Sequence, residues 1–259
     1  MELGIAGKTA LVTGAGRGLG AGIARALAAE GVRVLATSRG AASLEETMDS
    51  LPQLLGHESL AIDIEQQGAV ERLLSWLDSR ETPIDIVINN VGGTMGMDDP
   101  LSSFDNFSRV IALNLGVAVD VNRHIIPSMI SRGWGRVCHV SSISALENQG
   151  PPAYCAAKAA LNAYVRSLGR YVSEHNVILT GIMPGAVFTE GGYWDTTSQM
   201  RPEHVDRYLA ERMAIKRFGT EAEIADAVAF LVSERASFLV GSILLADGGQ
   251  GRTFFSQES

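Results

Sequence analysis

Residues 9–31 read TALVTGAGRGLGAGIARALAAEG, and this stretch decides the fold. Its first five residues form a short apolar run rich in β formers, which predicts a buried strand. A glycine cluster begins at Gly14, and Ile23 and Leu27 then recur at helical spacing among alanines. Strand, glycine turn and helix in this order are typical of a phosphate-binding unit, because free N–H groups at a helix N-terminus attract an anion. The glycines at positions 14, 16, 18 and 20 do not spell the commoner G-x-G-x-x-G, so an ordinary tight turn remains the alternative.

The rest of the chain alternates between short apolar runs and longer amphipathic segments. Further strands are predicted at residues 32–38, 59–62, 84–88, 136–140, 177–183 and 241–245. Helices are predicted from Ser43-x-x-Glu46, over about 66–79 and 104–131, from Ala153, and from Thr220-x-x-Glu223 to Val232. This alternation predicts an α/β fold, a single-domain Rossmann-type doubly wound parallel sheet of about seven strands with helices on both faces.

Composition narrows the function classes. The chain has 259 residues, 46% of them hydrophobic, and no linker or charge block divides it, so residues 1–259 are predicted to form one domain. The net charge is −8 without a basic cluster, which argues against a nucleic-acid partner. Cys138 and Cys155 are too few for a disulfide framework and lack metal spacing, so we expect no metal and a reduced, cytoplasmic setting. No apolar stretch approaches 18 residues, so no membrane partner is expected.

The end of the second predicted strand bears on the choice of dinucleotide. An acidic residue there binds the ribose 2′-hydroxyl of NAD, whereas an arginine suits the 2′-phosphate of NADP. Here the strand ends in Ser38-Arg39, and Arg17 lies in the glycine turn, so NADP (NADPH) is favoured over NAD. The alternative is that Arg39 is a solvated loop residue that does not bind the cofactor. Asp63 and Ile64 follow the third strand, where the carboxylate could reach an adenine rim or remain in solvent.

The stretch from Ser141 to Lys158 contains the candidate reacting groups. Ser142 follows a predicted strand, Tyr154 comes twelve residues later, and Lys158 lies one helical turn after the tyrosine. An ammonium on the same helix face would lower the pKa of the phenol, which could then exchange a proton with a substrate oxygen. A surface lysine beside a half-buried tyrosine is the alternative reading of this spacing.

Three other segments complete the predicted site. Asn90 and Gly92 follow the fourth strand, where amides and glycines hold ligands but also form ordinary turns. Asn114 is polar within an apolar helical stretch, which predicts a local kink or a bound water. The pattern weakens over about residues 187–215, and an insertion of this size at the carboxyl edge of a sheet predicts a substrate lid.

Seven motifs occur in one order along the chain and carry a resemblance. They are Thr13-Gly14-x-x-x-Gly18-x-Gly20, Asn89-Asn90-x-Gly92, Asn114, the serine before the tyrosine, Tyr154-x-x-x-Lys158, Pro184-Gly185 with Thr189, and Asp247-Gly248-Gly249. On these motifs the sequence resembles the short-chain dehydrogenase/reductase family over essentially its full length. The resemblance implies hydride transfer between NAD(P) and an alcohol or ketone. The chain departs from the family in having Val91 where alanine is usual.

The resemblance implies a role for each matched residue. Tyr154 would be the acid/base, Lys158 would lower its pKa and bind the nicotinamide ribose, Ser142 would polarise the substrate oxygen, and Asn114 would hold a water. The family interval of thirteen residues points to Ser141 instead, but the position after the predicted strand favours Ser142. The cofactor-binding residues indicated are Gly14, Arg17, Gly18, Leu19, Gly20, Ser38, Arg39, Asp63, Ile64, Asn90, Gly92, Tyr154, Lys158, Pro184, Gly185, Val187 and Thr189.

The predicted function is NADP-dependent reduction of a ketone to a secondary alcohol by a dinucleotide-binding catalytic domain similar to 3-oxoacyl reductases. Two alternatives stay open: an alcohol-oxidising dehydrogenase acting on a sugar, polyol or steroid, and a catalytically silent NADP-binding regulator or scaffold. The expected partners are a small carbonyl or alcohol substrate and further copies of the chain, since the family commonly forms tetramers. Gly191, Gly192, Tyr193 and Trp194 make the predicted lid partly aromatic, but they do not identify a substrate.

Overall fold

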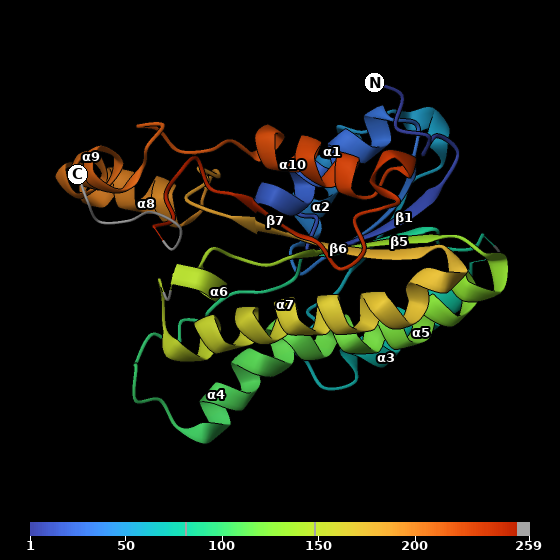
Figure 1. Ribbon diagram of the computed structural model, residues 1–259, viewed down its shortest axis with the longest axis horizontal. Helices are drawn as coiled ribbons and strands as arrows, with labels where there is room; N and C mark the ends of the chain where they lie inside the picture. The colour runs from blue at the N-terminus through green and yellow to red at the C-terminus, as the bar shows by residue number, and fades with distance from the viewer. Residues whose placement is uncertain (81, 148, 253–259) are drawn as a thin grey trace.

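A computed structural model describes residues 1–80, 82–147 and 149–252, in which seven parallel strands form one sheet (Figure 1). The strands are β1 Thr9–Thr13, β2 Arg33–Ser38, β3 Glu58–Ala61, β4 Ile86–Asn89, β5 Gly135–Val140, β6 Val177–Pro184 and β7 Ile243–Ala246. Their spatial order is β3-β2-β1-β4-β5-β6-β7, so the sheet grows outward in both directions from the β1–β4 pair. This confirms the predicted doubly wound α/β fold. The carboxyl ends of β1 and β4 form the switch point where such sheets bind ligands.

Helices cover both faces of the sheet. The helices in chain order are α1 Gly18–Ala29, α2 Ala41–Asp49, α3 Ala69–Asp78, α4 Phe104–Ile111, α5 Val117–Arg132, α6 Ser144–Glu147, α7 Pro152–Val172, α8 Tyr193–Met200, α9 Pro202–Arg212 and α10 Glu221–Leu231. In Figure 1, α1, α2 and α10 lie on one face, while α3, α5 and α7 lie on the other. Short 3₁₀ turns are found at Gln53–Leu55, Ser173–His175 and Glu234–Ala236.

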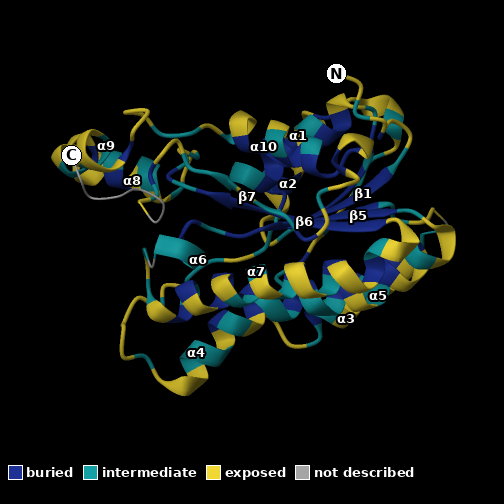
Figure 2. Cartoon of the chain, viewed as in Figure 1, coloured by how far each residue is buried: buried dark blue, intermediate teal, exposed yellow. Residues whose placement is uncertain are grey.

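The core has two layers, one on each side of the sheet (Figure 2). Val12 points to the layer that contains the apolar residues of α1 and α10, and Leu11 points to the layer formed with α3, α5 and α7. β1, β5 and β6 are buried along their whole length, because helices cover both of their faces. Burial on both faces explains why β1 and most of β6 read as apolar runs, whereas β5 also contains the buried Arg136 and His139.

One of the two predicted capping boxes is wrong and the other is confirmed. α2 begins at Ala41 after Gly40, two residues before Ser43, and the Ser43 hydroxyl donates to Gly40 O (3.2 Å) from inside the helix. Extended backbone at Gly40 already starts the helix, so Ser43 cannot act as its cap. At α10, Thr220 Oγ1 accepts from Glu223 N (3.2 Å), and the Glu223 carboxylate accepts from Thr220 N (2.9 Å), as a capping box requires.

The segment at 187–215 is more regular than its weak sequence pattern indicates. It contains α8 and α9, which extend beyond the carboxyl edge of the sheet (Figure 1). An aromatic cluster packs there, with the Trp194 ring centroid 4.3 Å from Tyr208 and 4.8 Å from Phe218. Among residues 1–80, 82–147 and 149–252, no helix has both the length and the apolar character that crossing a membrane would need.

Candidate active site

The glycine turn after β1 is held by the end of β4. Asn90 Nδ2 donates to Thr13 O (3.0 Å) and Gly14 O (3.1 Å), and Asn90 N donates to Thr13 Oγ1 (3.0 Å). Gly20 packs so closely that a Cβ there would lie 2.2 Å from Gly14 O. No side chain caps α1 at Arg17. The first N–H groups of α1 therefore remain available for an anion at the switch point.

A cavity of about 240 Å³ lies beside this turn, at the carboxyl ends of β1 and β2. Gly14, Arg17, Ser38 and Arg39 line it, together with Ile64 and other residues from the ends of the neighbouring strands. Arg39 Nη1 lies 3.2 Å from Glu65 Oε1, and 65% of the arginine side chain is exposed. The guanidinium is thus partly paired yet accessible from the cavity.

A second cavity of about 530 Å³ lies on the other side of the glycine turn. It brings together groups from the ends of β1, β4, β5 and β6. Its predicted cofactor residues are Arg17, Gly18, Leu19, Gly20, Asn90, Gly92, Tyr154, Lys158, Pro184, Gly185, Val187 and Thr189. Asp63 lines neither of these two cavities, and its carboxylate instead accepts a hydrogen bond from Glu65 N (3.2 Å). The two cavities adjoin, because Arg17, Asn90 and Gly92 line both.

Ser142 rather than Ser141 lies with the tyrosine. The Ser142 hydroxyl forms a hydrogen bond with the Tyr154 side chain, accepts from Ser144 N (3.1 Å) and donates to Ser144 Oγ (3.1 Å). Ser141 is buried, and its Oγ donates to Lys158 O on the backbone of α7 (3.4 Å). Consecutive residues at a strand end point to opposite sides, so only one serine can reach the phenol.

The electrostatics of the Tyr154–Lys158 pair differ from the prediction made from their spacing. Lys158 is buried and Tyr154 is half-buried, and Lys158 Nζ donates to Val140 O (2.9 Å) and lies 5.6 Å from the centroid of the tyrosine ring. Burial lowers the pKa of Lys158 to about 8. Burial also raises the pKa of Tyr154 above its ordinary value, against a smaller lowering by the Ser142 hydrogen bond. The expected lowering of the tyrosine pKa by the ammonium is therefore wrong for this arrangement, because desolvation dominates at both groups.

Asn114 lies in a π-helical turn, Ala112–Gly116, between α4 and α5. Its Nδ2 donates to Val110 O (2.9 Å) and Gly93 O (2.8 Å), and its Oδ1 accepts from Gly93 N (3.0 Å). The predicted kink is therefore confirmed as a π-bulge, which frees backbone groups at a polar side chain. A Cβ at Gly92 would lie 2.5 Å from Asn114 Oδ1 and 2.9 Å from Lys158 Nζ, so only glycine fits between these two groups.

A third cavity, of about 790 Å³, opens from Ser142 and Tyr154 toward α8 and α9. Tyr193 and Trp194 of the predicted lid line this cavity. Gln149, Tyr208 and Gln250 line it too, and the sequence did not predict them. Gln250 directly follows Asp247-Gly248-Gly249, which is the only local signal that could have drawn attention to it. Gln149 and Tyr208 carry no signal, because they come from a loop and from an amphipathic helix that meet only in the folded chain.

A glycine turn at the switch point of a doubly wound sheet, with serine, tyrosine and lysine at the same edge, defines a dinucleotide-dependent oxidoreductase. Residues 14–250 match the family model described as enoyl-(acyl carrier protein) reductase. The chain belongs to the short-chain dehydrogenase/reductase family.

Named relatives cover nearly the whole chain. The chain is 31% identical to the 3-oxoacyl-[acyl-carrier-protein] reductase MabA of Mycobacterium avium, over 94% of this chain and 90% of that protein. It is also 31% identical to the L-xylulose reductase of Mesocricetus auratus, over 96% of this chain and 98% of that protein. Among solved structures, the L-sorbose reductase of Gluconobacter frateurii, complexed with NADPH and L-sorbose, superposes with a TM-score of 0.90 at 30% identity, covering 98% of this chain and all of that one.

Proposed function

We propose that this protein is an NADPH-dependent reductase that converts a ketone into a secondary alcohol. The observation that carries the proposal is the convergence of Ser142, Tyr154 and Lys158 in a cavity shared with the glycine turn. When bound there, NADPH would supply the hydride. A catalytically silent binding protein would have no use for a tyrosine beside a buried lysine at this edge.

The residues of this chain have distinct tasks in the proposed reaction. The Ser142 hydroxyl, which donates to Ser144 Oγ in this structure, would turn its proton to the substrate carbonyl oxygen and stabilise the negative charge that develops on it. The Tyr154 O–H delivers the proton to that oxygen. Burial raises the pKa of Tyr154, so the phenol holds the proton that reduction of the ketone requires. Lys158 and Asn114 hold the backbone around the tyrosine through Val140 O and Gly93.

The preference for NADPH rests on charge at the end of β2. Arg17, Ser38 and Arg39 line the cavity there, and guanidiniums bind phosphate oxygens well. Glu65, the only carboxylate among the residues lining this cavity, already pairs with Arg39. A 3-oxoacyl (acyl-carrier-protein) reductase from Agrobacterium tumefaciens, with NADP bound, superposes with a TM-score of 0.87 at 32% identity, covering 96% of both chains.

The cysteines and the surface support a proposal for the compartment and for the assembly. Cys138 and Cys155 are free and buried, which suits a reducing compartment such as the cytoplasm. Exposed apolar side chains in and before β7, at Phe238, Val240 and Leu244, support a homo-oligomer, a dimer or a tetramer. The segment 187–215 would act as a lid over the substrate.

Replacing Tyr154 with phenylalanine tests the mechanism. The expected result is a loss of kcat of at least about 100-fold, because the variant lacks the proton donor. NADPH should still bind with nearly unchanged affinity, measured by fluorescence titration. The assay is NADPH absorbance with a panel of ketoses, oxo esters, oxo steroids and an acyl thioester mimic. A Tyr154→Phe variant with the wild-type rate would refute the role of the tyrosine, and tight NADPH binding without turnover of any ketone would favour the silent binding protein.

A further inference from the structure

A single buried amide connects three segments around the substrate cavity. Gln250 follows β7 and is 2% exposed. Its Oε1 accepts a hydrogen bond from Ala186 N at 2.7 Å, which fixes the orientation of the amide, since a backbone N–H can only donate. Its Nε2 therefore holds both hydrogens, and it donates them to Gln149 Oε1 and to the Tyr208 hydroxyl oxygen, each at 2.7 Å.

These two bonds decide what Gln149 and Tyr208 can offer to a ligand. The Gln149 carbonyl oxygen is engaged, so its Nε2 group remains, and Nε2 has no hydrogen-bond partner within residues 1–80, 82–147 and 149–252. The Tyr208 oxygen accepts from Gln250, which leaves its own proton free to donate. Both residues line the cavity that opens from Tyr154. This side of the cavity therefore presents hydrogen-bond donors.

Two arginines lie in a cavity beside these donors. An adjoining cavity of about 470 Å³ shares Gln149 and Tyr208 and is also lined by Arg207, Glu211 and Arg212. Arg212 acts on the Tyr208 phenol and opposes the rise in its pKa that burial causes. Neither arginine has an ion-pair partner in the described part of the chain, and the single carboxylate of Glu211 leaves the surface positive overall.

We propose that Gln149, Tyr208 and Arg212, which we call the donor wall, bind a carboxylate, so that the substrate is an oxo acid. This inference rests on the reductase function proposed above. A carboxylate accepts hydrogen bonds and donates none, so it matches the Gln149 Nε2, Tyr208 O–H and Arg212 donors. An apolar acyl chain in the same place would leave these donors unpaired, which costs affinity. Gln250 is a positioning residue, because it acts through Gln149 and Tyr208.

The test compares oxo acids with their methyl esters, using the full chain and NADPH. The substrates are 4-oxopentanoate, 5-oxohexanoate and the two matching esters, and the readout is NADPH absorbance. The wild type should reduce the acids with a kcat/KM at least tenfold above that of the esters. Gln149→Glu puts a charge in the donor wall and should lower this acid-to-ester ratio at least tenfold, mainly through KM for the acid.

Gln250→Glu tests the positioning role with little change in shape. The new carboxylate can still accept from Ala186 N, but it has no N–H to donate. The Gln149 amide would then turn to donate to residue 250 and would present its oxygen to the cavity. The acid-to-ester ratio should therefore fall at least tenfold, whereas a purely structural residue would change both substrates alike.

Gln67→Glu is the matched control, because it adds the same charge at an exposed residue that lines neither cavity and lies outside the 187–215 segment. The acid-to-ester ratio of kcat/KM in this control should stay within twofold of the wild-type ratio. Esters reduced as well as acids, or an unchanged ratio in Gln149→Glu, would overturn the carboxylate inference and leave the reductase standing. If neither acids nor esters are reduced, the inference also fails. The reductase proposal fails with it only when the wider ketone panel is inert as well.

Discussion

The buried amine of Lys158 makes the stability of the protein depend on pH. In the folded chain burial lowers the lysine pKa from 10.5 to about 8. Between these two values the unfolded chain binds a proton that the folded chain has released, so stability must rise as the pH increases through this window. Below pH 8 the folded protein has to hold the charge in a buried site.

Lys158→Met measures this effect. The variant lacks the titrating group, so the wild type should gain about 2 kcal/mol of unfolding free energy relative to the variant between pH 7.5 and pH 10. Urea denaturation of both proteins at several pH values, without cofactor, gives the difference. A difference that stays flat over this range would show that the amine is not desolvated as the structure places it.

Arg39 should decide between the two dinucleotides. Arg39→Asp replaces a phosphate-binding group with a carboxylate that repels the 2′-phosphate and can accept from a ribose hydroxyl. We expect the ratio of kcat/KM for NADPH over NADH to fall about 100-fold. Glu65→Gln removes the competing carboxylate and should raise the same ratio, since Arg39 loses its ion-pair partner. A wild-type preference for NADH would contradict the assignment.

For single residues, the sequence predicted which side chains meet in the site but not how the site shifts their pKa values. A helical spacing of four residues was enough to place Tyr154 and Lys158 together, and the strand end was enough to favour Ser142. The direction of the tyrosine pKa shift could not be predicted, because it depends on how deeply both groups are buried. Gln250 was missed for a related reason: its three partners come from three distant segments of the chain.

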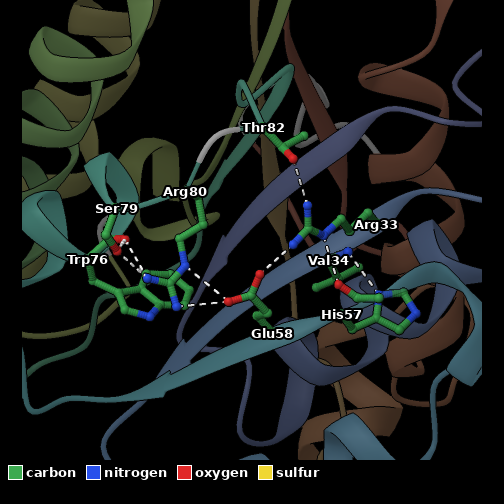
Figure 3. Close-up of polar contacts among 9 residues, drawn as sticks. Arg33, Val34, His57, Glu58, Trp76, Ser79, Arg80 and Thr82 are labelled. Carbon is green, nitrogen blue, oxygen red and sulfur yellow. Dashed lines mark hydrogen bonds and ion pairs between the residues drawn. The ribbon is translucent and has the colours of Figure 1, made fainter.

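Among the elements, the edge strand β3 is anchored by charges at its first residue. Glu58 lies between two arginines that belong to different segments (Figure 3). Its Oε2 accepts from Arg80 Nε (3.1 Å) and Nη2 (2.8 Å), and its Oε1 accepts from Arg33 Nη2. The Arg80 guanidinium also lies over the Trp76 ring, 4.3 Å from its centroid. One carboxylate thus connects β3 to β2 and to the end of α3.

Glu58→Ala should lower the unfolding free energy by about 1 kcal/mol. The loss stays small because the carboxylate is 35% exposed and water screens it, although two arginines are left facing each other. Urea denaturation should show the loss at low salt and a smaller one at 1 M salt. Activity should not change, since Glu58 lies at the amino end of its strand, away from the site. Glu45→Ala on α2 is the control, and an equal loss there would remove the special role of Glu58.

Strands were easier to predict than helix starts. Every predicted strand lies within two residues of the observed one. Burial on both faces explains this for the central strands, whereas the edge strands β3 and β7 are only partly buried. The start of α2 was wrong because Gly40 begins the helix through its backbone conformation, which leaves no side-chain pattern. The π turn at Asn114 was predictable only as a kink, since the exact backbone pattern depends on its contact with Gly93.

On the scale of the whole molecule, the two edges of the sheet differ. The β3 edge carries Glu58 with its arginines, and charge of this kind prevents strands from pairing edge to edge. The β7 edge is apolar: Leu244 is 40% exposed, and Phe238, just before the strand, is 97% exposed. α7 lies next to this edge, because Gly169 packs directly against Gly241, and it adds the exposed Tyr171. An apolar surface that includes an edge strand is typical of an interface.

We therefore expect copies of the chain to associate through the β7 edge. Sedimentation equilibrium of the wild type should give a multiple of the 27.5 kDa chain mass. Phe238→Asp and Leu244→Lys each place a charge in the buried contact, where an unpaired charge is costly, and should shift the protein to the monomer. Leu54→Asp changes a fully exposed leucine that lies outside this edge, and should leave the assembly intact. A monomeric wild type, or dissociation by Leu54→Asp as readily as by Phe238→Asp, would show that the β7 edge is not the interface.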